Sequence, residues 1–342
     1  MSAIVPISEY DRQTTKAQSA VRRTKHRALT FTAADLGSME FPPIKWIVPG
    51  VLPEGATILA GRPKLGKSWL ALDLGLAVAR GDYCLGDIKC ETGDVLYLAL
   101  EDNQRRLKWR INKLSPPASA EPWPERLCLA TEWPRSDGGG LAEIERWAGS
   151  VQHPRLVIVD VLNQFRASRQ TSETHYEADY AAVKGLQELA GRLRLGVLIV
   201  HHVRKGTGDF DPFERVSGTM GLTGAADTTI VLDRDGNGCS LYGRGRDISE
   251  FEKAVSFNKD TCRWMIQGEV ADVRRTDERS EILAVLSTAE EPMSPTEIAD
   301  ATGMNRNNAK QLLYKMAKDG QVDKAGKGRY LRPSRSADAD RE

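Results

Sequence analysis

The stretch Ile58-Leu59-Ala60-Gly61-Arg62-Pro63-Lys64-Leu65-Gly66-Lys67-Ser68-Trp69-Leu70-Ala71-Leu72 decides the fold of this chain. An apolar run stops at Gly61, and Gly66-Lys67-Ser68 then opens a segment rich in alanine and leucine. The order matches Gly-x-x-x-x-Gly-Lys-Ser/Thr, in which glycines let the backbone wrap a phosphate and N–H groups at a helix start point toward it. We therefore predict a strand over Ala56–Ala60, a helix over Lys67–Arg80 and a nucleoside triphosphate bound between them.

Two residues at the end of this motif have separate predicted roles. Lys67 supplies positive charge to the β- and γ-phosphates, and the Ser68 hydroxyl is a ligand for Mg²⁺. ATP and Mg²⁺ are therefore the predicted cofactors. The predicted nucleotide-binding residues are contiguous: Gly61, Arg62, Pro63, Lys64, Leu65, Gly66, Lys67, Ser68 and Trp69.

A second apolar segment, Leu156-Val157-Ile158-Val159-Asp160, ends in a carboxylate. Ligands of open α/β sheets bind at the carboxyl ends of the parallel strands, so Asp160 is expected at the same edge as the phosphate motif. There it can hold Mg²⁺ through water. We predict Asp160 as the second metal-site residue, beside Ser68.

Two further segments bring polar side chains to that edge. In Leu98-Ala99-Leu100-Glu101-Asp102 we predict Glu101 as the general base that polarises the attacking water, because it follows the strand directly. Asp102 is the competing candidate, although capping the next helix would also explain it. Another apolar run ends in His201-His202, and we predict His202 as the side chain that senses the γ-phosphate through a hydrogen bond.

Apolar and helical segments alternate from about residue 44. Strands that are apolar throughout and separated by helices indicate an α/β fold with a parallel sheet covered on both faces. After Asp227 the strands become shorter, which indicates antiparallel hairpins on that side. The predicted strands are Ala56–Ala60, Asp94–Leu100, Leu156–Val159, Gly196–Val200, Thr228–Leu232, Ser240–Tyr242, Ala254–Asn258 and Cys262–Ile266. The predicted helices between them are Lys67–Arg80, Asn103–Leu114, Leu141–Ser150 and Tyr176–Leu193.

The composition excludes several classes of protein. The chain has 342 residues and a net charge of +1, so any nucleic-acid binding needs local basic patches. Its five cysteines contain no Cys-x-x-Cys pair, which indicates reduced thiols in a cytoplasmic protein. No apolar stretch is long enough to cross a bilayer, so no membrane partner is expected.

Taken together, these segments resemble the RecA-like ATPase core, and more closely the plasmid RepA-type hexameric helicases and their AAA_25-type relatives. The resemblance covers roughly residues 44–268. Its discriminating features are Glu101 on a different strand from Asp160 and the run His-His-x-x-Lys. The segments that carry it are GRPKLGKS (61–68), LALED (98–102), LVIVD (156–160), HHVRKG (201–206), SGTMGLTGAAD (217–227) and LYGRGRD (241–247).

The resemblance implies a hexameric ring in which a neighbour's arginine, the arginine finger, completes each ATP site. A fixed guanidinium there stabilises charge that develops on the γ-phosphate. Arg244 and Arg246, in a Gly-Arg-Gly-Arg hairpin, are the implied fingers. Relatives often carry an arginine at the position of Ser217, so Arg215 is a third candidate. The alternative interpretation of the arginine pair is an ordinary solvated hairpin.

The resemblance also implies that two loops line a central channel and hold single-stranded DNA through phosphate contacts. These loops span residues 161–176 and 204–216, and neither is strongly aromatic. Their predicted DNA-binding residues are Arg166, Arg169, Arg204, Lys205 and Arg215.

A separate C-terminal module follows, over residues 278–333. A helix over Glu278–Ala289 precedes the capping box Ser294-Pro295-Thr296-Glu297, and a third helix over Asn305–Asp319 precedes a hairpin. This order resembles the winged-helix fold, in which the third helix enters the major groove and the wing meets phosphates. Protein docking is the alternative use of such a module. The predicted duplex-DNA contacts are Arg306, Asn307, Asn308, Lys310, Lys327 and Arg329.

The predicted organisation is a basic arm and lead-in (1–43), a RecA-like ATPase core (44–268), a charged linker (269–277), the winged helix (278–333) and a disordered tail (334–342). The predicted function is an Mg²⁺-dependent ATPase acting on DNA, as a hexameric replicative-type helicase or translocase of a plasmid, phage or mobile element. Replication proteins are a further class of partner. The alternatives are an ATP-dependent DNA-binding regulator or loader, and a RecA-type recombinase.

Overall fold

The structure is a computed structural model, and it describes residues 30–116, 122–167, 175–203, 211–214, 216, 221–236, 238–289, 291–326 and 328–332. The chain divides into two units, Met1–Pro43 and Ile44–Glu342. In the described part of the first unit, the short helix α2 (Ala33–Gly37) starts at Thr32, which forms a capping box with Asp35. The sequence analysis predicted only an arm here and missed this turn of helix.

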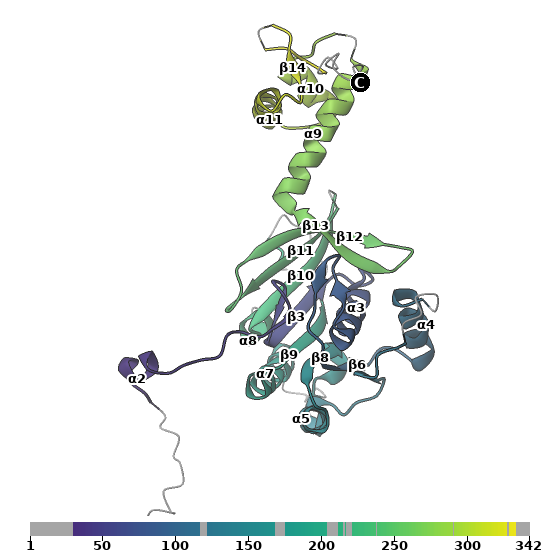
Figure 1. The fold of residues 1–342 in the computed structure, drawn as a ribbon, viewed down its shortest axis with the longest axis vertical. Helices are drawn as coiled ribbons and strands as arrows, with labels where there is room; N and C mark the ends of the chain where they lie inside the picture. Colours follow the sequence, from purple (N-terminus) through teal and green to yellow (C-terminus); the bar gives the residue numbers. More distant parts are fainter. Residues whose placement is uncertain are drawn as a thin grey trace, which may run out of the picture. The chain divides into compact units, whose positions relative to one another are not determined.

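A nine-stranded sheet forms the centre of the second unit, in the order β13-β12-β11-β10-β3-β9-β8-β6-β7. The strands from β10 to β7 in this order run parallel, whereas β11, β12 and β13 are antiparallel to their neighbours (Figure 1). This confirms the predicted α/β fold with hairpins on one side. The bounds are β3 (Gly55–Gly61), β6 (Asp94–Ala99), β7 (Leu127–Ala130), β8 (Pro154–Asp160), β9 (Gly196–His202), β10 (Thr228–Asp235), β11 (Gly238–Gly245), β12 (Phe251–Asn258) and β13 (Arg263–Glu269).

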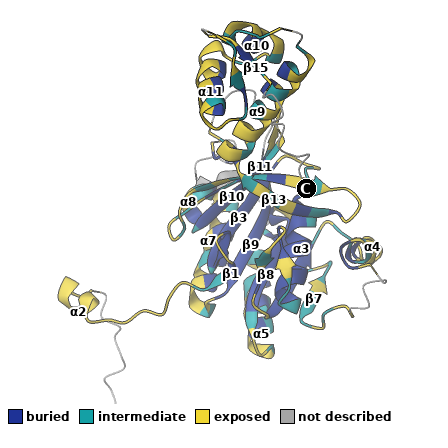
Figure 2. Cartoon of the chain, turned by 45° about the horizontal axis from the view of Figure 1, so that its top comes forward, coloured by how far each residue is buried: buried dark blue, intermediate teal, exposed yellow. Residues whose placement is uncertain are grey.

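Helices cover both faces of the sheet because successive strand residues point to opposite sides. Leu59, Tyr97 and Ile158 pack with α3 (Lys67–Arg80) and α4 (Gln104–Leu114). Their chain neighbours, such as Ile58, pack on the other face with α5 (Gly140–Ser150) and α7 (His175–Leu193). Figure 2 shows the resulting pattern, with buried central strands, a largely buried α3, and partly exposed helices α4 and α5.

Several short elements were not predicted. They are the hairpins β1 (Trp46–Val48) with β2 (Leu52–Pro53) and β4 (Tyr83–Cys84) with β5 (Ile88–Lys89), the edge strand β7, the 3₁₀ turn Ser136–Gly138, and the short helices α6 (Leu162–Phe165) and α8 (Gly221–Ala225). The edge strand is partly exposed and follows a Pro- and Ala-rich stretch, so it lacks the apolar run by which the central strands were found. Among the described residues, no helix combines the length and the apolar character needed to cross a membrane.

The C-terminal module has its own apolar core. Its helices are α9 (Val270–Thr288), α10 (Pro295–Thr302) and α11 (Arg306–Lys318), followed by the paired strands β14 (Asp323–Lys324) and β15 (Tyr330–Leu331). The predicted capping box is present, because the Ser294 side chain accepts from the N–H of Glu297 and the Glu297 carboxylate accepts from the N–H of Ser294. Helix, short helix, helix and hairpin follow in the winged-helix order.

The predicted linker over residues 269–277 was wrong as secondary structure. Glu269 is the last residue of β13, and residues 270–277 form the first turns of α9. Charged residues had been taken as a break in the pattern, but arginine and glutamate are good helix formers. With no glycine or proline between Val270 and Thr288, nothing in the segment interrupts a helix.

Candidate nucleotide site

Four neighbouring strands deliver the predicted site residues to one edge of the sheet. In the registers of the parallel pairs, Gly61 lies beside His202, and Ala99 lies beside Asp160. In the strand order β3-β9-β8-β6, the carboxyl ends therefore carry, from one strand to the next, the start of the phosphate loop, His202, Asp160 and Ala99. Adjacent strands are about 4.8 Å apart, so the whole set lies within about 15 Å.

Lys67 lies at the centre of this edge and is 3% exposed. Its Nζ donates to the carbonyl oxygens of Gly61 at 2.7 Å and Arg62 at 2.9 Å, and lies 3.1 Å from His202 Nδ1. Burial lowers the pKa of Lys67 to about 8, although the charges of Asp160 and Glu101 act in the opposite direction. Among the described residues no carboxylate lies within ion-pair distance of this lysine, so Asp160 and Glu101 compensate its charge only from further away.

The contact with Lys67 also defines the state of the imidazole. A protonated lysine has only N–H donors, so Nδ1 of His202 accepts and the ring proton is on Nε2. Burial and then the charge of Lys67 lower the pKa of His202, which favours this neutral form. The arrangement leaves an Nε2–H donor beside the lysine, as a phosphate sensor requires. His201 has no such contact with Lys67, and its pKa is lowered mainly by burial.

The oxygen donors predicted for Mg²⁺ are adjacent. Asp160 is 6% exposed, and the Ser68 hydroxyl lies close enough to act on the pKa of its carboxylate. Tyr97 donates from its hydroxyl to Asp160 Oδ2 at 2.6 Å. Burial raises the pKa of Asp160, while the hydrogen bond from Tyr97 and the hydroxyl of Ser68 oppose this shift. A hydroxyl and a carboxylate side by side at a helix N-terminus suit a hard cation that is also bound by phosphates.

Tyr97 was missed by the sequence analysis. Its signal is a hydroxyl-bearing residue inside the otherwise apolar strand DVLYLA. A buried tyrosine usually finds a partner for its O–H, and here the register with β8 supplies Asp160.

The structure separates the two acids after β6. Asp102 accepts from Nη1 of Arg106 at 2.8 Å and from Nη1 of Arg110 at 2.6 Å, and its side chain is 6% exposed. The helix is capped by Asn103, which accepts from the N–H of Arg106, so the interpretation of Asp102 as the cap was wrong. Glu101 is exposed and close enough for its charge to act on Lys67 and His202. Glu101 is therefore the acid that remains available to a water molecule.

The backbone of the phosphate loop is packed against the antiparallel side of the sheet. A Cβ on Gly61 would lie 2.5 Å from the carbonyl oxygen of Leu232, and Gly66 has φ of +103°. Trp264, fully buried on β13, donates from Nε1 to the carbonyl oxygen of Gly66 at 3.2 Å. This tryptophan was also missed, because it is 198 residues from its partner in the sequence.

Two tryptophans flank the start of α3. The rings of Trp69 and Trp109 meet edge to face with centroids 5.5 Å apart, and Arg110 lies over Trp69 at 5.5 Å. Trp109 is 52% exposed. Trp69, which the sequence analysis predicted to bind nucleotide, is therefore packed against a second tryptophan.

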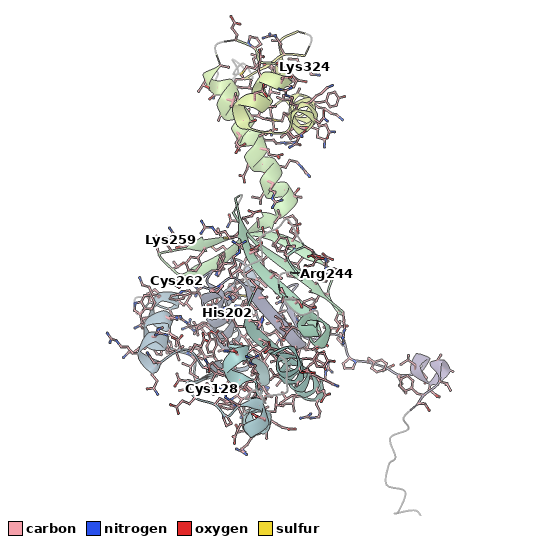
Figure 3. All side chains as sticks on the ribbon, turned by 180° about the vertical axis from the view of Figure 1, so that it is seen from behind. Cys128, His202, Arg244, Lys259, Cys262 and Lys324 are labelled. Carbon is pink, nitrogen blue, oxygen red and sulfur yellow. The ribbon has the colours of Figure 1, made fainter. Side chains whose placement is uncertain are left out.

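The structure does not bring Arg244 and Arg246 to the phosphate loop of the same chain. Arg244 pairs with Thr229, which pairs in turn with Ile58, three positions before Gly61 on β3. Both arginines line a cavity of about 480 Å³ that includes Asp211, Phe213 and Asp227. Arg246 lies 3.6 Å from the Asp227 carboxylate and donates to the carbonyl oxygen of Gly224. Figure 3 shows that Arg244 and His202 come from different elements of the fold.

The predicted DNA contacts of the core are only partly described. Arg166 donates to Asp179 at 2.7 Å, and both side chains are about 15% exposed, so this ion pair competes with a phosphate contact. The other predicted loop residues, Arg169, Arg204, Lys205 and Arg215, lie outside the described residues, as does Ser217.

In the C-terminal module the predicted contacts start at the N-terminus of α11. Lys310 and Asn307 are exposed, whereas Arg306 pairs with Asp300 and Asn308 donates to Glu278. Arg329 donates to the carbonyl oxygen of Pro292, and Lys327 lies outside the described residues. Tyr314, 62% exposed on the same helix, lies under Lys324 of the wing.

Comparisons with solved structures show the fold of the core. One solved ATPase domain is 13% identical with a TM-score of 0.50, over 76% of this chain and 99% of that chain. A DnaB-like replicative helicase, solved for its interactions with primase, is 13% identical with a TM-score of 0.51, over 74% of this chain and 71% of that chain. The core is thus a RecA-like fold.

Family models match both parts of the chain. Residues 280–326 match the IclR helix-turn-helix domain, which agrees with the winged-helix order of α9 to β15. Residues 20–208 match the AAA domain model AAA_25, which includes the phosphate loop, Glu101, Asp160 and His202. The protein therefore belongs to the AAA_25 family of AAA domains.

Proposed function

We propose that this protein is an Mg²⁺-dependent ATPase that assembles into a ring, as a hexamer, and moves along DNA as a helicase or translocase. The observation that carries the proposal is the convergence of Lys67, Ser68, Asp160, Glu101 and His202 at one sheet edge. A buried lysine at a helix N-terminus, with no ion pair to any carboxylate that the structure describes, is suited to the phosphates of a nucleotide. DNA-dependent motion is supported by the RecA-like fold shared with replicative helicases and by the helix-turn-helix domain.

Each residue has a step in the proposed reaction. Lys67 exchanges its two carbonyl partners for phosphate oxygens, and Nε2–H of His202 donates to the γ-phosphate. Glu101 orients water and accepts its proton as the water oxygen bonds to the γ-phosphorus. The bond from that phosphorus to the bridging oxygen breaks, and ADP leaves with that oxygen. Ser68 and Asp160 would hold Mg²⁺, which when bound neutralises charge on the β- and γ-phosphates. Arg244 or Arg246 of a neighbouring copy would stabilise the charge that develops on the γ-phosphate.

A second candidate function is a DNA-binding regulator or loader in which ATP controls assembly. The observation that favours it is α11, whose described outer face carries Asn307, Lys310 and Tyr314 beside the wing. A helix of this kind reads base edges in the major groove. The regulator would bind one duplex sequence tightly and hydrolyse ATP slowly, whereas the helicase would be stimulated by single strands of any sequence.

ATP turnover with and without single-stranded DNA, together with native mass measurement, tests the proposal. We expect ring formation with a non-hydrolysable ATP analogue, and DNA-stimulated turnover that Glu101→Gln lowers by about a thousandfold while nucleotide binding persists. Asp102→Asn is the matched control, and we expect it to keep turnover within a few-fold, because Asp102 is bound to two arginines. Monomers under all conditions, or full turnover in Glu101→Gln, would contradict the proposal.

A further inference from the structure

Arg244 is fixed in direction by an acid of its own hairpin. Its Nε and Nη2 donate to Oε2 and Oε1 of Glu250 at 3.2 and 2.8 Å. Glu250 precedes β12 directly, in the connection that follows β11. A two-point contact between guanidinium and carboxylate sets the plane of the guanidinium group. Glu250 therefore anchors the arginine to the antiparallel part of the sheet.

The other contacts of Arg244 come from residues after β9, far from the hairpin in the sequence. Nη1 donates to Oδ2 of Asp211 at 3.1 Å, and the guanidinium carbon lies 4.3 Å from the ring centroid of Phe213. The carboxylate of Asp211 also accepts from the N–H of Phe213, so the two residues act as one unit. Phe213 is 7% exposed and belongs to the apolar cluster on the α5 and α7 side of the sheet.

These contacts leave part of the guanidinium free for an anion. Arginine has five N–H donors, and in the described part of the chain Glu250 and Asp211 occupy three of them. The side chain of Arg244 is 48% exposed and opens into the 480 Å³ cavity with Arg246. The arginine is thus held in a fixed direction while two donors remain for a phosphate.

We infer that Asp211 and Phe213 are positioning residues that couple the loop after β9 to the arginine finger Arg244, while Glu250 anchors that finger to the hairpin. The inference rests on the proposed function, in which the protein moves along DNA and Arg244 acts on a neighbour's γ-phosphate. The described residues 211–214 belong to the segment to which the family resemblance assigns DNA contacts. DNA that displaces residues 211–214 changes the contacts on one side of the guanidinium. The finger then turns about its anchor on Glu250, and hydrolysis responds to DNA.

The test compares DNA stimulation, the ratio of kcat with single-stranded DNA to kcat without it, in three charge-neutralising variants of the full chain. Asp211→Asn is expected to lower this ratio about fivefold, because it weakens the contact between residues 211–214 and Arg244. Glu250→Gln is expected to lower kcat about tenfold both with and without DNA, because a misplaced catalytic group is costly. KM for ATP and the melting temperature stay unchanged in both, since neither residue lies at the phosphate loop. Glu214→Gln is the control, because it removes a charge from the same segment that is not paired with Arg244 among the described contacts.

A second measurement shows whether Asp211 acts through the arginine. Adding Asp211→Asn to Arg244→Ala must cause no further change in the stimulation ratio. A wild-type ratio in Asp211→Asn, or a further loss in the double variant, would overturn the inference. Failure of the proposed function would look different, because the wild-type protein itself would then lack DNA-stimulated turnover.

Discussion

Lys67 and Arg244 are the two cationic side chains to which the proposed reaction assigns phosphate contacts, and they differ in burial and in the groups that they contact. Lys67 is 3% exposed, and its Nζ contacts two carbonyl oxygens and a neutral imidazole. Arg244 is 48% exposed and contacts two carboxylates. Burial lowers the pKa of Lys67 to about 8, whereas the hydrogen bonds that Arg244 donates to Glu250 raise the pKa of Arg244.

The difference in burial and in charge partners indicates which ligand each residue is suited to bind. A buried charge with no opposite charge in direct contact is costly, so the phosphate loop gains stability when an anion binds. Arg244 is already compensated within its chain, and exposed ion pairs are worth little, so its acids mainly set its direction. In the proposed ring the phosphate loop and Arg244 are the two halves of one ATP site, and neighbouring chains supply them.

Alanine substitution of the two cations is expected to give the largest and most distinct effects. Lys67→Ala should lower kcat/KM for ATP by about a thousandfold and weaken nucleotide binding, because it removes a buried charge on the phosphates. Arg244→Ala should lower kcat by about a hundredfold with little change in nucleotide affinity, because a finger acts on the transition state. Binding of a fluorescent ATP analogue, measured beside turnover, separates the two outcomes.

This comparison breaks if Arg244→Ala loses nucleotide affinity as strongly as Lys67→Ala does. Arg246→Ala is the matched control, since it lies in the same cavity two residues away and pairs with Asp227. An equal loss of kcat in both arginine variants would mean that the two arginines act together. A loss confined to Arg246→Ala would assign the role of arginine finger to Arg246.

The same contrast explains which features could be predicted from sequence. Helix α3 was predicted with the bounds Lys67–Arg80 that the structure has, because glycine, the helix start and the apolar run are all local signals. Glu101, Asp160 and His202 could be predicted to share one sheet edge because each lies at or just after the end of an apolar strand, and parallel strands bring their ends together. The positions of the candidate site residues within one chain could therefore be predicted from the apolar pattern and from the geometry of a parallel sheet.

The contacts that hold these residues were not predictable in the same way. Tyr97 meets Asp160 across 63 residues and Trp264 meets Gly66 across 198, and such pairs depend on strand register. The acids around Arg244 come from two loops, whose sequences carry no periodic signal. The start of α9 was missed for another reason, because a run of charges was taken to interrupt the helix although it contains good helix formers.

Mixing two inactive variants sharpens the comparison, with a smaller expected effect. Lys67→Ala subunits keep their arginine, and Arg244→Ala subunits keep their phosphate loop. If neighbours share a site around a ring, an equimolar mixture restores about a quarter of wild-type turnover, because about one interface in four then joins the two intact halves. Turnover of the mixed, reassembled protein measures this directly.

The control for that experiment is the double variant Lys67→Ala/Arg244→Ala mixed with Arg244→Ala. It has the same subunit ratio but supplies no intact arginine, so turnover should fall to about half that of Arg244→Ala alone, because half of the phosphate loops carry Lys67→Ala. Absence of recovery in the first mixture, with exchange of subunits verified by mass, would place the finger within the chain of its own phosphate loop. The strand register makes that arrangement hard to build, since Arg244 lies at the level of Ile58.

The smallest expected effect comes from pH, and it acts on Lys67 alone. Its pKa in the folded protein is about 8, below the ordinary value of 10.5, so between these values the unfolded chain binds more protons and the free protein becomes more stable as pH rises. A bound triphosphate favours the charged lysine, so above pH 8 nucleotide binding takes up a proton. The dissociation constant should therefore rise about eightfold between pH 7.5 and pH 9.

Two variants assign this pH effect to its source. Arg244→Ala should keep the eightfold change, because Arg244 stays charged throughout this range and lies outside the site of its own chain. Lys67→Arg should flatten it even if affinity falls, since a guanidinium does not titrate here. His202 does not compete, because burial and the charge of Lys67 lower its pKa from 6.5, so its charge changes at lower pH. A flat wild-type profile would mean that Lys67 keeps its proton through contacts other than the carbonyl oxygens of Gly61 and Arg62 and the imidazole of His202.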